Sequence, residues 1–215
     1  MPTQARLFAP ISPTSEIEAV NIMLSTIGES PINSFEEING DIAIAKNTLY
    51  EVSKAVQLEG WQWNTEDNFP LQPDANTHKI KVDPTIARVW FPHPFTQELV
   101  VRGGYVYDRD RHTFAFGNDF KVNASILRIL PFDALPETAK RYITIRASRV
   151  FQERVVGSST LTTFTSQDEI RARSTLLDEE HRLNRPNILK GDLPPTGTWN
   201  PVVTLFNRGG WHYGR

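Results

Sequence analysis

The chain has 215 residues, no cysteine and a formal net charge of −2. The lack of cysteine excludes a disulfide framework, a thiolate zinc site and a cysteine nucleophile. The charge balance argues against a protein that grips nucleic acid over most of its surface. No apolar run approaches the ~20 residues of a membrane helix, and the start, MPTQARLFAPISPTSE, lacks the apolar core of a signal peptide. We therefore expect a soluble, cytoplasmic product.

A first helix is predicted from about residue 15 to residue 27. Ser15 and Glu18 have the spacing of a capping box, in which both side chains satisfy amide donors at a helix start. Gly28 and Pro31 are typical of a helix end. Between them, apolar residues recur at helical spacing: Ile17, Val20, Met23, Leu24 and Ile27.

A second helix is predicted from about Asp41 to Gly60. Steps of three and four residues separate its apolar positions: Ile42, Ala45, Leu49, Val52 and Val56. Trp61 and Trp63 follow at once. Large aromatic residues just past a helix end bury much area, so we expect these two to fix the helix to the core.

From Phe69 to Leu130 the pattern changes to short β-type pieces. Prolines, glycines and asparagines separate apolar–polar alternations that are rich in β-branched and aromatic residues, which is typical of antiparallel strands. The pieces are HKIKV, IARVWF, LVVR, YVYD, TFAF, FKVN and SILRIL.

Within this region, Gly103 and Gly104 separate two β-type runs. A phosphate-binding loop would need a helix after its glycines, and no helical pattern follows here. A two-residue hairpin turn needs positive φ at both positions, which glycine adopts at no steric cost. We therefore predict a β-hairpin with its turn at Gly103–Gly104.

Asp108, Asp110 and His112 alternate just after this turn. On a strand they would project from one face, and two carboxylates with an imidazole can bind a metal ion. Arg109 and Arg111 interleave with them, however, and such a pattern also describes an ordinary solvated strand face. We favour the solvated face and predict no metal site.

A third helix is predicted from Pro136 to Gly157, with Pro136 in its first turn. Its expected buried side is Ala139, Ile143, Ala147, Val150 and Phe151, and its basic residues are Lys140, Arg141, Arg146, Arg149 and Arg154. After a loop, SSTLTTFT, a second capping-box spacing at Ser166 and Glu169 predicts a fourth helix to about Leu183. The basic face can pair with the acidic fourth helix, form a subunit contact or meet phosphates, and we favour the first two.

The residues after Pro186 differ in composition from the rest of the chain. They are rich in proline and glycine and have no helical period, yet they carry Trp199, Phe206, Trp211 and Tyr213. A disordered tail usually lacks such aromatic residues, so we expect an extended arm that docks on a partner. A second RGG at Arg208 is too short to indicate RNA binding.

These elements predict an α+β fold, mainly helical: an antiparallel helix bundle formed by residues 1–66 and 131–185, an inserted small antiparallel β domain at 67–130, and a C-terminal arm at 186–215. No G-x-S-x-G, no H-E-x-x-H and no distinguished carboxylate pair is visible. The pattern therefore favours a structural or assembly protein without a catalytic site, cofactor or metal. Two alternatives remain: a glycan hydrolase that uses acidic residues of the β region, and a nucleic-acid-binding module that uses the third helix.

Four stretches, in this order, resemble the tail tubular protein A family of short-tailed bacteriophages. They are AVNIMLSTIGESPINSF from Ala19, GWQWNTE from Gly60, RGGYVYDR from Arg102 and ITIRASRVFQERVVGS from Ile143. Together they span about Ala19 to Leu183. The segment FPHPFTQE and the residues after Pro186 have no match in this resemblance.

The resemblance implies a head-to-tail adaptor, or gatekeeper, in the virion tail, assembled in the host cytoplasm. Twelve copies would form a ring between the capsid portal protein and a tubular nozzle protein of the tail tubular protein B type. Genome DNA would pass through the bore without sequence-specific binding. No cofactor or membrane is implied.

Three groups of residues are candidate contacts in such a ring. Because a ring contact is heterologous, one chain needs two different complementary surfaces. For the subunit interface we expect Arg141, Arg146, Arg149, Arg154, Glu169, Glu179 and Glu180. For contact with the nozzle or a neighbour we expect Arg102, Gly103, Gly104, Asp108 and Arg109, and for the arm's contact with the portal or a neighbour Trp199, Phe206, Arg208, Trp211 and Tyr213.

Overall fold

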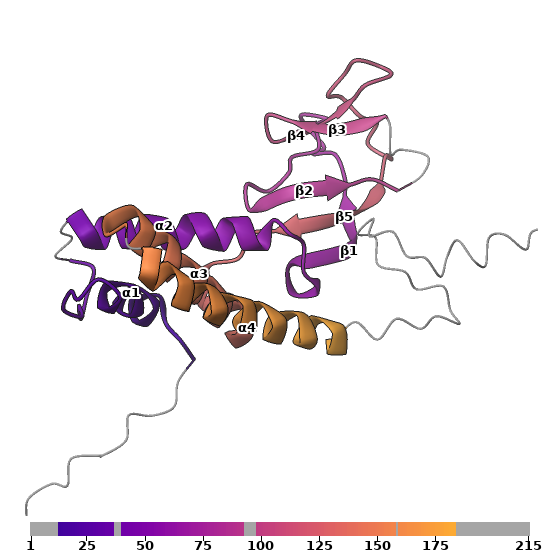
Figure 1. Ribbon diagram of the computed structural model, residues 1–215. Coiled ribbons are helices and arrows are strands. Elements are labelled where there is room, and N and C mark those ends of the chain that lie inside the picture. Colours follow the sequence, from indigo (N-terminus) through magenta and orange to yellow (C-terminus); the bar gives the residue numbers. More distant parts are fainter. Residues whose placement is uncertain (1–12, 37–39, 93–97, 158, 184–215) are drawn as a thin grey trace, which may run out of the picture. The chain divides into compact units, whose positions relative to one another are not determined.

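The computed structural model describes residues 13–36, 40–92, 98–157 and 159–183, and the side chains of α4 from Ser166 onward. These residues form four α-helices and five β-strands in an α+β fold (Figure 1). The helices are α1 (Glu16–Ser25), α2 (Gly40–Gln57), α3 (Glu137–Val155) and α4 (Ser159–Leu183). None of the helices in these ranges is long and apolar enough to cross a membrane.

The ends of α1 and α2 lie where the sequence indicates. Ser15 is the N-cap of α1, and its hydroxyl accepts a hydrogen bond from the backbone N–H of Glu18. Gly28 and Gly60 adopt φ values of 83° and 84° just after the two helices, a left-handed conformation that glycine takes without strain. Every residue of the apolar stripe predicted for α2 is buried.

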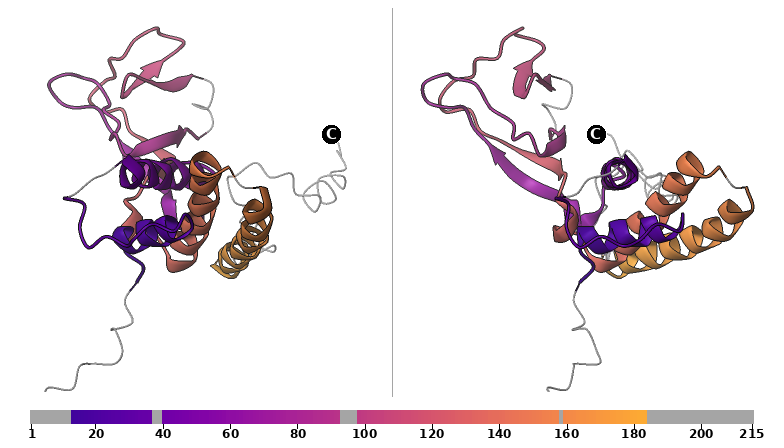
Figure 2. Two further views of the ribbon diagram at one scale, coloured as in Figure 1. Left: turned by 60° about the vertical axis from the view of Figure 1, so that its left-hand side comes forward. Right: turned by 90° about the vertical axis from the view of Figure 1, so that its left-hand side faces the viewer.

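All four helices contribute to one hydrophobic cluster. Its largest fully buried side chains are Tyr142 and Phe151 of α3, Met23 and Leu24 of α1, Leu49 of α2 and Leu176 of α4. Trp61 is buried in this cluster and stacks on the partly buried Trp63, as predicted. Of the predicted buried side of α3, Val150 is only partly buried. Figure 2 shows α4 lying along α3, against which it packs.

The strands form two antiparallel sheets. β1 (Thr65–Leu71), β5 (Val122–Arg128) and β2 (Ile86–Trp90) make a three-stranded sheet in the order β1-β5-β2, while β3 (Leu99–Arg102) and β4 (Tyr105–Asp108) make a hairpin. A second hydrophobic cluster, which includes Leu71, Ile80, Val106 and Val122, lies among them. Gly103 and Gly104 have φ values of 58° and 80°, so the predicted hairpin turn is confirmed.

Several predicted strands are wrong in their bounds. β1 begins at Thr65, before the predicted β region, because the chain enters it directly from a short 3₁₀ turn, Gln62–Asn64. HKIKV and TFAF form only single bridges, Lys81 with Tyr105 and Asp108 with Thr113. FKVN and SILRIL contribute to one strand, β5, which pairs with neighbours on both sides and therefore continues through both pieces.

The predicted loop before the fourth helix is also wrong. α4 begins at Ser159, so the stretch predicted as a loop starts the helix, and Ser166 lies inside it rather than at its N-cap. Each serine or threonine in a helix interior lowers helix stability by only roughly 0.5 kcal/mol relative to alanine. Such a weak preference does not prevent these residues from forming the first turns of a long helix. α3 begins at Glu137, with Pro136 as its N-cap residue.

Gln57 connects the helical elements to the strands. Its buried side chain donates to the carbonyl of Leu130 at 3.0 Å and accepts from the N–H of Leu130 at 2.8 Å. Its own carbonyl accepts from the side chain of Asn64 at 2.9 Å, and the Asn64 oxygen accepts from the N–H of Trp61 at 2.8 Å. These bonds satisfy backbone groups at two places: a buried one where the chain leaves α2 and a partly buried one where it returns from β5.

Candidate interaction surfaces

The contact between α3 and α4 is a network of charged side chains. Arg149 Nε donates to Glu169 Oε2 at 2.5 Å, and Arg146 Nε lies 3.7 Å from Glu169 Oε1. Arg149 also donates to Glu153 on its own helix at 2.9 Å. The hydrogen bond to Glu169 raises the pKa of Arg149 above its usual range. The predicted pairing of the basic α3 with the acidic α4 is therefore confirmed for these residues.

The network continues from α4 to the end of α2. Arg173 donates to both carboxylate oxygens of Glu59, at 3.2 and 2.9 Å, and to the Tyr142 hydroxyl at 2.9 Å. These bonds, that to Glu59 first, raise the pKa of Arg173 above its usual range. Arg146 also lies 3.7 Å from Glu59. Planar guanidinium groups form such bidentate ion pairs with carboxylates. The pairs therefore fix the positions of α2, α3 and α4 along one another.

Sequence reasoning missed Glu59, Tyr142 and Arg173 in this network. Tyr142 was not among the residues predicted for the buried side of the third helix, and Arg173 carried no motif of its own. One available signal was the spacing of Glu169 and Arg173, four residues apart, which places both on one face of a helix. Glu59 gave no signal, because only the fold brings the end of α2 to α4.

Arg154 pairs with α2 rather than with α4. It donates to both carboxylate oxygens of Glu51, at 2.8 and 3.0 Å, and to the Thr48 hydroxyl at 3.3 Å. The bond from Arg154 holds the pKa of Glu51 below its usual range. The guanidinium groups of Arg146, Arg149 and Arg154 thus already bind carboxylates of their own chain, which leaves them poorly placed to meet phosphates.

The remaining predicted interface residues lie at the two ends of the α3–α4 contact. Glu179 accepts a hydrogen bond from the Thr138 hydroxyl, and Glu180 Oε1 accepts one from the N–H of Gln62 at 2.7 Å. Arg141 is exposed on α3 and has no ion pair within the described ranges. Their role in contact between subunits stays a prediction.

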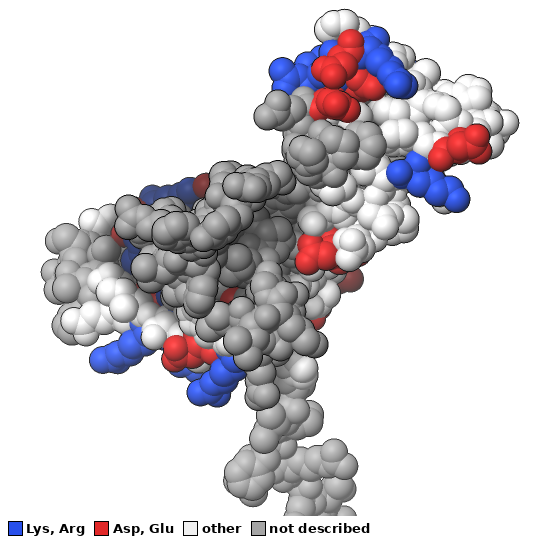
Figure 3. All heavy atoms as spheres, turned by 90° about the vertical axis from the view of Figure 1, so that its right-hand side faces the viewer, with Lys and Arg blue, Asp and Glu red and all other residues white. Residues whose placement is uncertain are grey.

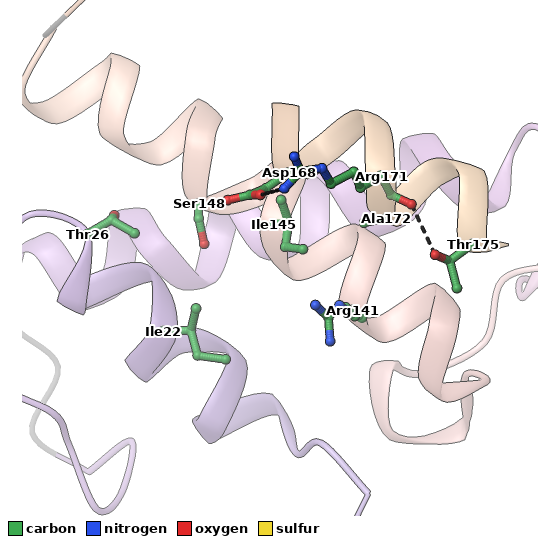
Figure 4. A pocket seen from close by; sticks show the side chains of 9 residues that line it. All are labelled: Ile22, Thr26, Arg141, Ile145, Ser148, Asp168, Arg171, Ala172 and Thr175. Carbon is green, nitrogen blue, oxygen red and sulfur yellow. Dashed lines mark hydrogen bonds and ion pairs between the residues drawn. The ribbon is translucent and has the colours of Figure 1, made fainter. Parts of the chain in front are cut away.

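A groove of about 540 Å³ runs between α1 and α4, and Arg141 lies on it (Figure 4). Ile22 and Thr26 line it from α1, Ile145 and Ser148 from α3, and Ala172 and Thr175 from α4. Figure 4 also shows Asp168 paired with Arg171 across one turn of α4, at 3.6 Å. Ile22 is 43% exposed. The groove therefore combines apolar side chains with hydroxyl groups and with charged groups of both signs.

The hairpin of β3 and β4 carries an exposed turn. Arg102, Gly103, Gly104 and Tyr105 are all exposed, and the Arg102 guanidinium lies over the Tyr107 ring at 4.3 Å. Figure 3 shows side chains of both signs mixed at the end of the molecule that carries β3 and β4. A mixed surface of this kind suits a protein partner better than a polyanion.

The predicted strand face of Asp108, Asp110 and His112 is wrong, because β4 ends at Asp108. The Asp108 carboxylate is nearly buried and accepts from the N–H groups of Asp110 and Arg111, both at 2.9 Å. Such bonds are typical of an aspartate that caps its own turn. His112 follows at a φ of 52°. In the ranges that the structure describes, no three acidic or histidine side chains are placed to hold a metal ion.

The arm residues Trp199, Phe206, Arg208, Trp211 and Tyr213 lie outside the described residues. Contacts within the chain divide it into one unit from Met1 to Leu183 and a second from Asn184 to Arg215. The boundary of the arm at residue 186 stays a prediction.

The described residues form a helical cluster crossed by ion pairs and two small antiparallel sheets. The family model described as "Tube: Tail tubular protein" matches residues 17–186, which span all four helices and five strands. The chain belongs to the tail tubular protein family, so it is a structural protein of the phage tail and a component of the virion. No curated protein matches the chain.

Proposed function

We propose that this chain is the head-to-tail adaptor that forms a ring between the capsid portal and the tubular nozzle of the tail. The match over residues 17–186 carries the proposal, since it includes both the helical elements and the strands. A ring of twelve copies would leave a bore through which genome DNA is ejected. The ring would assemble in the host cytoplasm and need no cofactor.

The charge of the chain supports passage of DNA without capture. Electrostatic affinity for DNA grows with the number of phosphates that lysine and arginine neutralise. The net charge is −2, and the arginines of α3 that face α2 and α4 bind carboxylates of the same chain. A bore built from such surfaces would not hold the moving duplex.

We assign contact with the nozzle, or with a neighbouring copy, to the β3–β4 hairpin. Its exposed turn offers Arg102, Gly103 and Gly104, with Arg109 just beyond β4. Asp108 serves this contact indirectly, since its carboxylate is bonded within its own turn.

Charge reversal at the hairpin tests this assignment. Arg109→Glu should weaken nozzle binding at least tenfold and leave binding to the portal unchanged. Arg88→Glu, a reversal at an exposed position on β2, is the matched control. Equal nozzle binding by both variants would remove the hairpin from the contact.

We assign a subunit contact to the surface that includes α3 and α4. Arg141 on the groove is the arginine of the predicted set that has no ion pair within the described ranges, so it is the arginine most open to a carboxylate of a neighbour. The arm would complete the assembly, because tryptophan and tyrosine anchor interfaces at low entropic cost.

Order of addition tests the adaptor role. Purified portal, chain and nozzle protein are mixed in pairs and together, then imaged by negative stain. The proposal predicts that the nozzle joins the portal only when the chain is present, with the chain's density between them. Direct binding of nozzle to bare portal, with the chain absent from the complex, would contradict it.

A further inference from the structure

The groove between α1 and α4 places a positive charge beside exposed apolar surface. Two of its charged side chains, Asp168 and Arg171, form an ion pair with each other at 3.6 Å. Arg141 is exposed and has no ion pair in the part of the chain that the structure describes. Ile22 lines the same groove and is 43% exposed (Figure 4). A complementary surface would therefore present an apolar side chain together with an unpaired carboxylate.

The start of α2 presents a surface of this kind. Ile44 is 42% exposed, and Asp41 lies in the first turn of the helix, three residues before it. Residues three apart are neighbours on a helix face. Asp41 is partly exposed and has no ion pair among the described residues. The ammonium group of Lys46, the nearest cation along the helix, lies 3.5 Å from Glu16, so this face of α2 keeps the negative charge of Asp41.

The position of α2 suits a ring contact better than the positions of α1 and α4. α1 and α4 both line the groove, so their contact with the groove of a second copy would bring similar regions together and close a pair. α2 packs on α1 and α3 and contributes no residue to the groove. Contact between α2 and the groove therefore joins two different regions of the chain, as a heterologous contact requires.

We propose that the face of α2 that carries Asp41 and Ile44 docks into the groove of a second copy of this chain. Asp41 would pair there with Arg141, and Ile44 would pack against Ile22. Each copy offers its α2 to one neighbour and its groove to the other. This inference rests on the proposed ring, and it adds which two surfaces meet in it.

The two charges are too far apart to pair within one chain. Thr48 of α2 accepts a hydrogen bond from Arg154 near the end of α3, and Gln57 bonds Leu130 before the start of α3. The two helices therefore run in opposite directions, and Asp41 lies toward the end of α3. From Arg154 back to Arg141 is about 20 Å along the helix. A pair between Asp41 and Arg141 therefore needs a second copy.

Charge reversal on each side tests the docking. Arg141→Asp and Asp41→Arg each place like charges in the contact, so each should raise the concentration needed for ring assembly on the portal at least tenfold at low salt. An equimolar mixture of the two variants should assemble like the parent. In an alternating ring the reversed groove meets the reversed α2, and the unchanged groove meets the unchanged α2, so every contact joins opposite charges.

Two further reversals are the matched controls. Glu29→Arg and Arg182→Asp make the same changes in charge at exposed positions that lie outside both the groove and α2. Both should assemble like the parent. All four positions are at least partly exposed, so every variant should unfold at the urea concentration of the parent.

A cross-link tests the same contact with both charges in place. The chain has no cysteine of its own, so Ile22→Cys and Ile44→Cys can be mixed in equal amounts on the portal and treated with a short bismaleimide. Docking predicts a covalent dimer joined between positions 22 and 44. Val101→Cys, at a position that is 40% exposed on β3, replaces Ile44→Cys as control and should give at least threefold less dimer.

The outcomes separate this inference from the adaptor role. Rings that form on the portal as readily with Arg141→Asp and Asp41→Arg as with the parent would overturn the docking and leave the adaptor role standing. Weak assembly of both variants that their mixture does not restore would do the same. A parent chain that stays monomeric with portal and gives no cross-linked dimer would overturn both.

Discussion

At the residue scale, we expect Gln57 to contribute strongly to the free energy of unfolding. It is 1% exposed, and its amide bonds both backbone groups of Leu130. We expect Gln57→Ala to lower the free energy of unfolding by about 1–3 kcal/mol, because it leaves two partly buried backbone groups of Leu130 unpaired and a cavity beside them.

Urea unfolding measures this loss, with Gln62→Ala as control. Gln62 is exposed in the 3₁₀ turn that follows. Substitution of such an exposed side chain usually changes the free energy of unfolding by no more than about 0.5 kcal/mol. Equal stability of both variants would show that the bonds between Gln57 and Leu130 contribute nothing to the junction.

Glu51 gives the stability a pH dependence of defined sign. Its pKa is lowered in the folded chain by the hydrogen bond from Arg154. A carboxylate with a lowered folded pKa stabilises the fold above its unfolded pKa, about 4.3, and loses this contribution as pH falls through the folded value. Because Glu51 is exposed, we expect a small effect that salt screens.

The variant Glu51→Gln checks this sign. It should be less stable than the parent at pH 7, and the difference should shrink as the pH falls and vanish once it is below the folded pKa of Glu51. The measurement is the urea midpoint of both chains at low salt across that range. A difference that grows on acidification would contradict the assigned cause.

At the element scale, the hairpin turn depends on two glycines in the left-handed region. Gly104 has a φ of 80° and open space around its missing side chain, so a substitution there is limited by backbone strain rather than by a clash. We expect Gly104→Val to cost about 1–2 kcal/mol. Gly117→Ala, at a glycine without positive φ and with equally open surroundings, should cost nothing measurable in the same unfolding experiment.

α4 should depend on its ion pairs. Glu169 accepts from Arg149 and lies near Arg146 with only 17% of its side chain exposed. Glu169→Ala should lower the free energy of unfolding by about 1–3 kcal/mol, since a hydrogen bond to a charged group is lost and two guanidinium groups lose their carboxylate. Asp178→Ala, at an exposed position of the same helix, serves as control, and indistinguishable unfolding curves for the two would refute this dependence.

The elements that the sequence predicted well are those with local signals. Ser15 and Gly28 bound α1, five apolar positions define α2, and Gly103–Gly104 defines the hairpin, because caps, periodicity and turns involve only neighbouring residues. β1 and the start of α4 were predicted wrongly. TEDNFPL forms a strand by pairing with β5, which lies far along the chain, and serine and threonine give only a weak local preference in STLTTFT.

The same distinction applies to the candidate surfaces. The charges of α3 and α4 suggested that these helices pair, and the pairing of Arg149 with Glu169 bears this out. The pairing of Arg154 with Glu51 and of Arg173 with Glu59 was not predictable, because each joins residues more than a hundred positions apart. The turn at Asp108 was not predicted, because the alternation of Asp108, Asp110 and His112 with arginines is also typical of a strand.

At the scale of the whole molecule, the arm should matter for assembly rather than for folding. Both hydrophobic clusters and all the described helices and strands lie before Asn184. A chain truncated after Pro186 should therefore unfold at the same urea concentration as the parent and bind portal at least tenfold more weakly. The full-length variant carrying Trp199→Ala and Trp211→Ala should likewise unfold at the urea concentration of the parent and bind portal more weakly. Undiminished portal binding by the truncated chain would remove the arm from the contact.

The adaptor role is tested most directly by the mass of the purified chain in solution, measured by light scattering, alone and then mixed with its portal. We predict a ring of about twelve copies, formed alone or only on the portal, and seen as such by negative stain. A chain that remains a monomer and ignores the portal would contradict the role proposed for it.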